Sequence, residues 1–276
     1  EDWKYTAMWR YDAMLDNYRD EGNGSNVNFQ RAYLDGRLFG LKVRAGRAPF
    51  NDGSMAQFNG GNIYDDRADL VSATYGKDIN LTLYAGRGAQ SGAGWAWDDD
   101  KKAMKETKAF TGNFWGANLG AKFSKATEAR LAYFRFSDPD ESVFYGTDND
   151  ALTIWTVGVK GTVAKQLVLA ADYYKSNAND QNKGWALGAQ WGKATPAKVG
   201  SWDLFVKYLK MDANSYIANG QLESVMSKNE GIKGWNIGAD YTIAKNIMAK
   251  VLYNNTKSTV GDKDQRCLWT SLHFNF

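Results

Sequence analysis

Few side chains in this sequence have the chemistry needed for catalysis. His273 is the only histidine and Cys267 the only cysteine. A serine or cysteine nucleophile needs an adjacent base to activate it, and we find no such arrangement around either residue. We therefore expect His273 to be an ordinary polar side chain, Cys267 to be inert, and the protein not to be an enzyme.

Cofactor and metal motifs are also missing from the pattern. The segment Gly86-Arg87-Gly88-Ala89-Gln90-Ser91-Gly92 is rich in glycine, but it lacks the spacing of a phosphate-binding loop and no helix follows it. The acidic cluster at 98–100 offers neither the spacing nor the ligand number of a calcium loop. We expect no cofactor and no metal.

The remaining charged side chains suggest a different kind of chemistry. Cations recur along the first quarter of the chain, at Arg10, Arg31, Arg37, Lys42, Arg44 and Arg67. Carboxylates gather in two nearby segments, at Asp52, Asp65, Asp66, Asp98, Asp99 and Asp100. A basic wall facing an acidic loop creates a transverse field that sorts polar solutes by size and charge. The alternative is that these are solvated loop charges or ion pairs, and the choice depends on which elements carry them.

Composition limits those elements. Aromatic residues make up 14% of the 276 residues, yet the mean hydropathy is −0.54. No stretch approaches the roughly 20 apolar residues of a membrane-spanning helix. The net charge is +3, without the basic excess or stripe of a nucleic-acid-binding protein, so we expect no nucleic-acid partner.

Alternation with a period of two dominates the chain, in segments of about ten residues. In 155–163 the odd positions are apolar and the even positions are small or polar. The same pattern recurs at 3–11, 167–173, 185–191, 202–208, 235–243 and 247–253. The face assignment is ambiguous at 67–76 and 128–136. These segments predict antiparallel β-strands with one apolar face and one polar face.

Aromatic residues lie near the ends of these segments, and their middles are aliphatic. The set is Trp3, Trp155, Trp185, Trp191, Trp202, Tyr208, Trp235, Tyr241 and Tyr253. Aromatic girdles around an aliphatic band are typical of a β-barrel that spans a membrane. A soluble sandwich would place its bulky aromatics at the strand centres.

The links between strands alternate between short and long. Short links occur at 39–40, 77–78, 124–127, 164–165, 193–200 and 244–246, and long ones at 15–26, 48–66, 87–110, 137–151, 176–183, 211–232 and 257–264. Short turns at one rim and long loops at the other are the outer-membrane pattern. The sequence thus predicts one domain, 1–276, an all-β antiparallel up-and-down transmembrane β-barrel of about 14 strands. Sixteen is the alternative, because the longest loops have room for another hairpin.

The last strand carries a resemblance to a known class. Leu272, Phe274 and Phe276 alternate on one face up to the final residue, which resembles the assembly signal of bacterial outer-membrane barrels. The segments 46–50 and 65–67, with the overall size, resemble the S-layer-homology-tethered porins of diderm Firmicutes (OmpM type). That family has an anchor domain before its barrel, and no leader is evident at Glu1, so we expect the barrel part only.

The resemblance implies a porin of the bacterial outer membrane that allows passive diffusion of small hydrophilic solutes and ions. It also implies a homotrimer, contact with outer-membrane lipid and lipopolysaccharide, and assembly through the C-terminal strand by the barrel-assembly machinery. Two alternatives stay open. One is a substrate-specific channel for a sugar or anion, with Tyr84, Tyr174 and Phe205 as an aromatic track. The other is a structural barrel with an occluded lumen.

Overall fold

The structure is a computed structural model of the chain. It describes residues 3–12, 26–50, 52–56, 58, 61–64, 67–89, 95–98, 103–106, 110, 112–137, 151–217, 231–260 and 264–275. Every regular element in these ranges is a β-strand. None of the described residues form a helix that is long and apolar enough to span a membrane.

The strands are 4 to 14 residues long. In chain order they are β1 (Lys4–Asp12), β2 (Asn26–Leu38), β3 (Leu41–Pro49), β4 (Arg67–Gly76), β5 (Ile79–Gly88), β6 (Trp95–Asp98), β7 (Ala103–Glu106), β8 (Asn113–Lys122), β9 (Thr127–Ser137), β10 (Ala151–Ala164), β11 (Leu167–Ser176), β12 (Lys183–Gly192), β13 (Trp202–Met211), β14 (Ile232–Ala244), β15 (Ile247–Lys257) and β16 (Asp264–Phe274).

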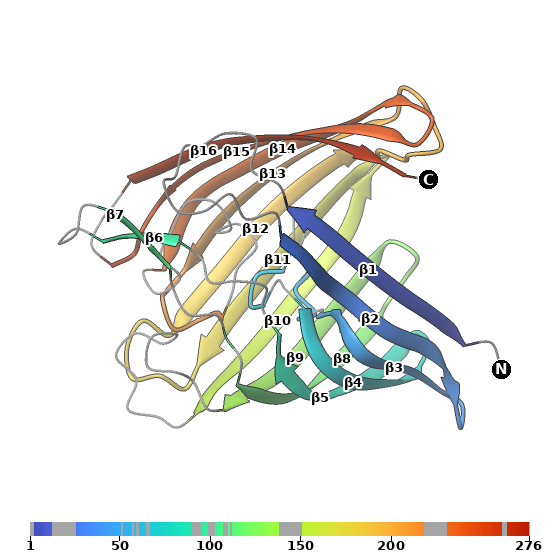
Figure 1. Cartoon of the computed structure of the whole chain (residues 1–276), viewed down its shortest axis with the longest axis vertical. Helices are drawn as coiled ribbons and strands as arrows, with labels where there is room; N and C mark the ends of the chain where they lie inside the picture. Colours follow the sequence, from blue (N-terminus) through green and yellow to red (C-terminus); the bar gives the residue numbers. More distant parts are fainter. Residues whose placement is uncertain are drawn as a thin grey trace.

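Fourteen of these strands form one antiparallel, up-and-down sheet, and this agrees with the predicted number. Its order follows the chain from β1 to β16 with β6 and β7 left out. The sheet curves strongly, so that its two edge strands, β1 and β16, approach the same side of the molecule (Figure 1). The extra hairpin of the 16-strand alternative exists within 87–110, but its strands β6 and β7 pair with each other in a separate two-stranded sheet.

The two rims of the sheet differ as the sequence predicts. The short turns, the start of β1 and the end of β16 lie together at the right of Figure 1, and we call this side the turn rim. Phe39 and Gly40 form the turn between β2 and β3 with φ angles of 50° and 79°, because a type I′ turn requires positive φ at both positions. We call the opposite side, where the longer connections lie, the loop rim.

The two faces of the sheet also differ as predicted. Apolar side chains such as Val157, Leu187 and Ile237 point outward and are 40–53% exposed. Their sequence neighbours on the concave face, such as Thr156 and Asn236, are buried. The strands with ambiguous faces follow the same rule: Val71 and Leu131 point outward, while Leu70 and Phe134 are buried inside.

Candidate functional site

A segment of the connection between β3 and β4 lies inside the curved sheet. Its described residues from Asp52 to Ala56 and from Asn62 to Tyr64 are all buried. We call residues 50–64 the inner loop. A loop that folds into a barrel narrows the space through which solutes pass, so these residues and the wall that they contact form the candidate site.

The carboxylate of Asp172 on β11 holds the main chain of the inner loop. The Met55 N–H donates hydrogen bonds to Asp172 Oδ1 at 2.8 Å and Oδ2 at 3.0 Å, and the Ala56 N–H donates to Oδ2 at 2.6 Å. A carboxylate that accepts several N–H groups is well compensated for its burial. Asp172 therefore fixes the loop to the wall through the backbone.

A second buried contact lies near the first. The Asn62 side chain donates through Nδ2 to the hydroxyl of Tyr174 at 2.8 Å, and its Oδ1 accepts from Lys207 Nζ at 3.1 Å. Tyr174 and Lys207 are both fully buried. The loop is thus fastened to β11 and β13 by side chains as well as by its backbone.

Asp52 organises the loop from within. Its Oδ1 accepts the Ser54 N–H at 2.8 Å, and its Oδ2 accepts the N–H groups of Ile63 and Tyr64. Asp52 has no exposed surface. Its carboxylate therefore joins the two ends of the loop. Asp52 is the one member of the predicted acidic set whose side chain the structure describes.

Two glycines on the wall make room for the inner loop. A Cβ atom at Gly158 on β10 would lie 2.0 Å from Asp172 Oδ1 and 2.8 Å from Met55 Cγ. A Cβ atom at Gly188 on β12 would lie 2.3 Å from the ring of Phe58. Any other residue at these positions would displace the loop or its anchor. The small residues of the concave face therefore partly serve close packing.

An aromatic cluster fills the space between the inner loop and the strands β5, β8 and β9. The ring of Phe50 lies 5.0–5.5 Å from the rings of Tyr64, Tyr84, Phe114 and Phe134. Such edge-to-face pairs each contribute about 1 kcal/mol beyond simple burial. The three residues of the aromatic-track alternative each contact the inner loop. Tyr84 packs on Phe50, Tyr174 binds Asn62, and Phe205 stacks on Phe58.

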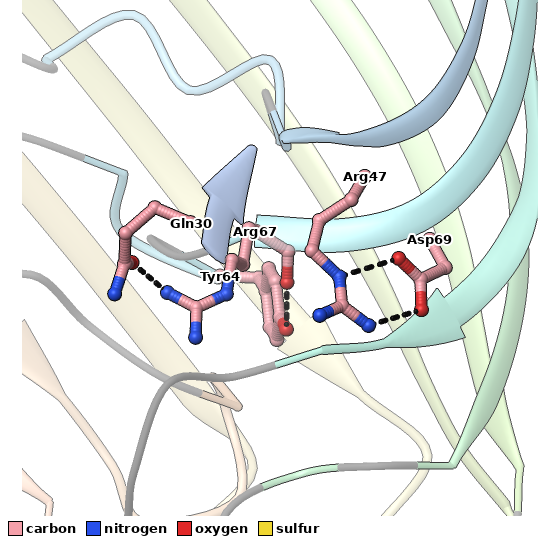
Figure 2. Close-up of polar contacts among 5 residues, drawn as sticks. All are labelled: Gln30, Arg47, Tyr64, Arg67 and Asp69. Carbon is pink, nitrogen blue, oxygen red and sulfur yellow. Dashed lines mark hydrogen bonds and ion pairs between the residues drawn. The ribbon is translucent and has the colours of Figure 1, made fainter. Parts of the chain in front are cut away.

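The end of the inner loop is tied to the start of β4. The Tyr64 hydroxyl donates to the Arg67 carbonyl oxygen at 2.8 Å, and the Arg67 guanidinium donates to the Gln30 side chain (Figure 2). Beside them, Arg47 forms a two-pronged ion pair with Asp69, with both N···O distances at 2.8 Å. Arg47 and Asp69 share the outward face with Val71, so this pair lies outside the lumen.

The lumen between the inner loop and the turn rim contains two adjoining cavities. One of about 760 Å³ lies at the turn rim and is lined by residues of the 122–128 segment, Asp78, Lys160 and Val168. The other, of about 310 Å³, lies beneath the inner loop against Arg130, Lys160, Val168 and Gln190. Lys160 and Val168 line both cavities, so the two cavities lie side by side.

The charges of these cavities are mainly positive. Their lining includes the cations Lys122, Lys125, Arg130 and Lys160 and the anions Asp78 and Glu128. Lys160 lies 2.8 Å from Glu128. Arg130 forms no hydrogen bond or salt bridge with the residues that the structure describes. Its side chain lines the smaller cavity beneath the inner loop.

Four residues of the predicted basic wall lie on β2 and β3. Arg31, Arg37, Lys42 and Arg44 share the inward face with Tyr33 and Asp35, as their register shows. Arg44 forms a bidentate ion pair with Asp35, at 2.7 and 3.0 Å. Arg37 and Lys42 face each other at the turn rim. Whether this wall acts on solutes stays a prediction.

Several predicted site residues fall outside the description. Asp65, Asp66, Asp99, Asp100 and Phe276 lie outside the described residues, and for Arg10 and Asp98 only the backbone is described. The acidic half of the predicted constriction field therefore stays a prediction.

The predicted girdle residues divide between the two rims. Trp155, Trp185, Tyr208, Trp235 and Tyr253 point outward in the halves of their strands near the loop rim. Trp3, Trp191, Trp202 and Tyr241 do so near the turn rim, where Leu272 and Phe274 also point outward beside Ala249 and Ile247. Ring pairs such as Trp185–Tyr208 at 5.4 Å and Tyr208–Trp235 at 4.8 Å join neighbouring strands.

Sequence reasoning did not single out Asp172, Lys207 or Arg130 as functional. A signal existed for the first two, since each is a charged residue in the middle of an alternating strand. Arg130 lies in 128–136, where the face assignment was ambiguous. The pairing of Gly158 with both Arg130 and Asp172 places Arg130 on the same inward face as Asp172.

The sequence matches neither a protein-family model nor a curated protein. Solved structures do match. OprB of Pseudomonas putida aligns with a TM-score of 0.57 at 12% identity, over 91% of this chain and 73% of that chain. A mutant of the Rh. blastica porin aligns with a TM-score of 0.52 at 12% identity, over 99% and 88%.

The chain has the fold of the outer-membrane porins. A third structure, the trimer form of OmpT, an outer-membrane protein of Vibrio cholerae, aligns with a TM-score of 0.50 at 12% identity, over 90% of this chain and 83% of that chain. The apolar outer face and the polar concave face of the curved sheet agree with that fold.

Proposed function

We propose that the protein is an outer-membrane porin that lets small hydrophilic solutes and ions diffuse through its lumen. The observation that carries this proposal is the arrangement of the two faces: apolar side chains cover the outside, and polar side chains line two adjoining cavities inside. We place the loop rim outside the cell and the turn rim in the periplasm, because long loops face outward in such barrels.

The accompanying proposals rest on resemblance. We assign the chain to the S-layer-homology-tethered type on the segments 46–50 and 65–67, and we propose a homotrimer, since the Vibrio cholerae OmpT structure is a trimer. Assembly by the barrel machinery through β16, contact with lipopolysaccharide and the absence of enzymatic activity belong to the same proposal.

A second candidate is a channel selective for anions. It is supported by the four cations against two anions along the cavities. Arg130, beneath the inner loop, also forms no hydrogen bond or salt bridge with a described residue. A low-dielectric channel of one sign concentrates the opposite ion. The aromatic packing around Phe50 supports a narrow lumen rather than a wide one.

Planar-bilayer recording of the purified chain tests both candidates. We expect stepwise, ohmic conductance. In a KCl gradient, we expect a reversal potential closer to the equilibrium potential of chloride than to that of potassium. Arg130→Gln should lower the chloride-to-potassium permeability ratio about twofold, because it removes a cation from the narrow part of the lumen. Lys193→Gln, an exposed lysine at the turn rim, is the control and should leave the ratio unchanged. Electrical silence of the folded protein would exclude a porin.

A further inference from the structure

The smaller cavity beneath the inner loop is lined by polar side chains from both the sheet and the loop. Arg130 on β9, Lys160 on β10 and Gln190 on β12 line it from the sheet, and Ser54 lines it from the inner loop. No carboxylate is among the described residues that line it. We call these four residues the cavity donors, because each side chain can donate a hydrogen bond.

The register explains how the three donors of the sheet meet. Arg130 pairs with Gly158, which has no side chain to cover it, and Lys160 follows two residues later on the same face of β10. Gln190 pairs with Val168 on β11, which also lines the cavity. The three side chains therefore point into the same part of the lumen from strands that lie close together in the sheet.

Three of the four cavity donors have no hydrogen-bond partner among the described residues. Ser54 is 4% exposed, and its Oγ has no partner. The side chains of Arg130 and Gln190 form neither a hydrogen bond nor a salt bridge within the described part of the chain. Buried polar groups are rarely left in this state, because an unmade hydrogen bond is costly. Water or a solute in the cavity must therefore supply the missing partners.

The carboxylates near the cavity are engaged elsewhere. Glu128 forms its ion pair with Lys160, at 2.8 Å. Asp172 lies on the far side of β10 from Arg130, and both of its oxygens accept N–H groups of the inner loop at 2.6–3.0 Å. In the part of the chain that the structure describes, the charge of Arg130 is thus not met by an ion pair.

The cavity donors suit an oxyanion better than chloride. The planar guanidinium of Arg130 can donate parallel hydrogen bonds to two oxygens of a carboxylate or phosphate, and Gln190 and Ser54 offer further donors. A spherical chloride ion makes less use of donors that are spread in this way. The volume of the cavity is about 310 Å³, room for roughly ten water molecules, so it admits the anionic group of a small solute.

We infer that the smaller cavity binds the carboxylate or phosphate group of a small solute through the cavity donors. Because Ser54 belongs to the inner loop and the other donors belong to the sheet, the bound group joins the loop to the wall. The site differs from the predicted basic wall on β2 and β3, since it lies on the strands around the loop's own anchor on β11. The inference deepens the anion-selective candidate function and rests on it.

The test uses the full chain folded in a zwitterionic detergent. Thermal unfolding is followed by circular dichroism at fixed pH and ionic strength while inorganic phosphate or acetate replaces sodium chloride. Acetamide, the uncharged analogue of acetate, is the ligand control. The variants are Arg130→Gln and Ser54→Ala. The matched control is Arg135→Gln, because Arg135 lies on the same strand but faces outward opposite Trp115.

Phosphate, acetate or both should raise the unfolding temperature of the parent with saturation, and acetamide should not. Arg130→Gln should weaken the apparent affinity about tenfold and Ser54→Ala about fivefold, while Arg135→Gln should bind as the parent does. Equal affinity in Arg130→Gln and the parent would overturn the inference. So would equal stabilisation by acetamide, or no stabilisation by either anion.

Ser54→Ala also separates a ligand-binding role from a structural one. Without ligand, this variant should be at least as stable as the parent, because it removes a buried hydroxyl that has no partner. A variant that loses stability without ligand, yet binds both anions as the parent does, would assign Ser54 to the loop alone. That result would overturn the proposed link between the loop and the wall.

Thermal unfolding needs no open pore, so it separates this inference from the proposed function. A chain that binds phosphate or acetate in detergent but is silent in bilayers would remove the porin proposal and leave the oxyanion site standing. A chain that conducts but is stabilised by neither anion would do the reverse.

Discussion

At the scale of single residues, the lumen uses its charges in two ways. Asp172 and Lys207 are buried and hold the inner loop, while Arg130 faces open space. Sequence alternation places Asp172 and Lys207 on the polar face and leaves the face of Arg130 ambiguous. It cannot distinguish a charge that binds the backbone from one that meets solutes. That distinction depends on where a loop more than 100 residues away is seated.

The first prediction concerns Asp172. Asp172→Asn replaces one acceptor oxygen with an NH₂ group that faces the N–H groups of Met55 and Ala56. We expect a loss of about 1–3 kcal/mol of stability, together with a larger and noisier single-channel conductance because the loop is released. Chemical unfolding in detergent and bilayer recording measure the two effects. Asp78→Asn at the turn rim is the control, and an unaltered conductance in Asp172→Asn would show that the carboxylate does not hold the loop.

The second prediction concerns the close approach at Gly158. Gly158→Ala places a methyl group 2.0 Å from the Asp172 carboxylate, so the anchor or Met55 must move. A cost of about 1–3 kcal/mol is expected for such overpacking. Gly161→Ala on the same strand is the matched control, since its nearest atoms lie 3.7 Å away, and it should cost under about 0.5 kcal/mol. Equal stability of the two variants would contradict this packing.

At the scale of elements, the sequence predicted the strands better than their surroundings. Period-two alternation and link lengths suffice for fourteen strands, because each strand needs only one apolar face. They failed to assign 67–76 and 128–136, where inward Leu70 and Phe134 pack against other protein groups and therefore resemble outward residues. An apolar side chain inside a barrel is identified only when its packing partner is known.

The third prediction tests the outward face. Val157 lies mid-strand on β10 and is 52% exposed, in contact with lipid if the barrel spans a membrane. Val157→Arg should cost about 2–4 kcal/mol in vesicles, because a charge enters the apolar band. Thr162→Arg, on the inward face beside the larger cavity, should be nearly neutral. Guanidinium unfolding of the chain in phospholipid vesicles measures both, and a tolerated arginine at Val157 would contradict a lipid-facing surface.

At the scale of the whole molecule, the inner loop and its aromatic cluster occupy part of the space inside the curved sheet. The aromatic cluster fills the side against β5, β8 and β9, and the cavities remain toward the turn rim. Sequence analysis expected the 48–66 segment to carry acidic constriction residues. It did not predict that the Asp52 carboxylate would accept backbone hydrogen bonds within the loop. An Asp that binds the backbone of its loop and an Asp that faces a pore have similar polar neighbours in the sequence.

The position of the inner loop has a consequence for how the chain reaches its final form. The loop precedes β4, yet its anchors Asp172 and Lys207 follow 117 and 145 residues later. Contacts so distant in sequence form only after the intervening chain has been ordered, since closing long segments costs entropy. Until β10 to β13 have formed, the inner loop lacks its hydrogen-bond partners Asp172 and Lys207. The inner loop therefore packs late in folding, and its burial indicates that β10 to β13 have already formed.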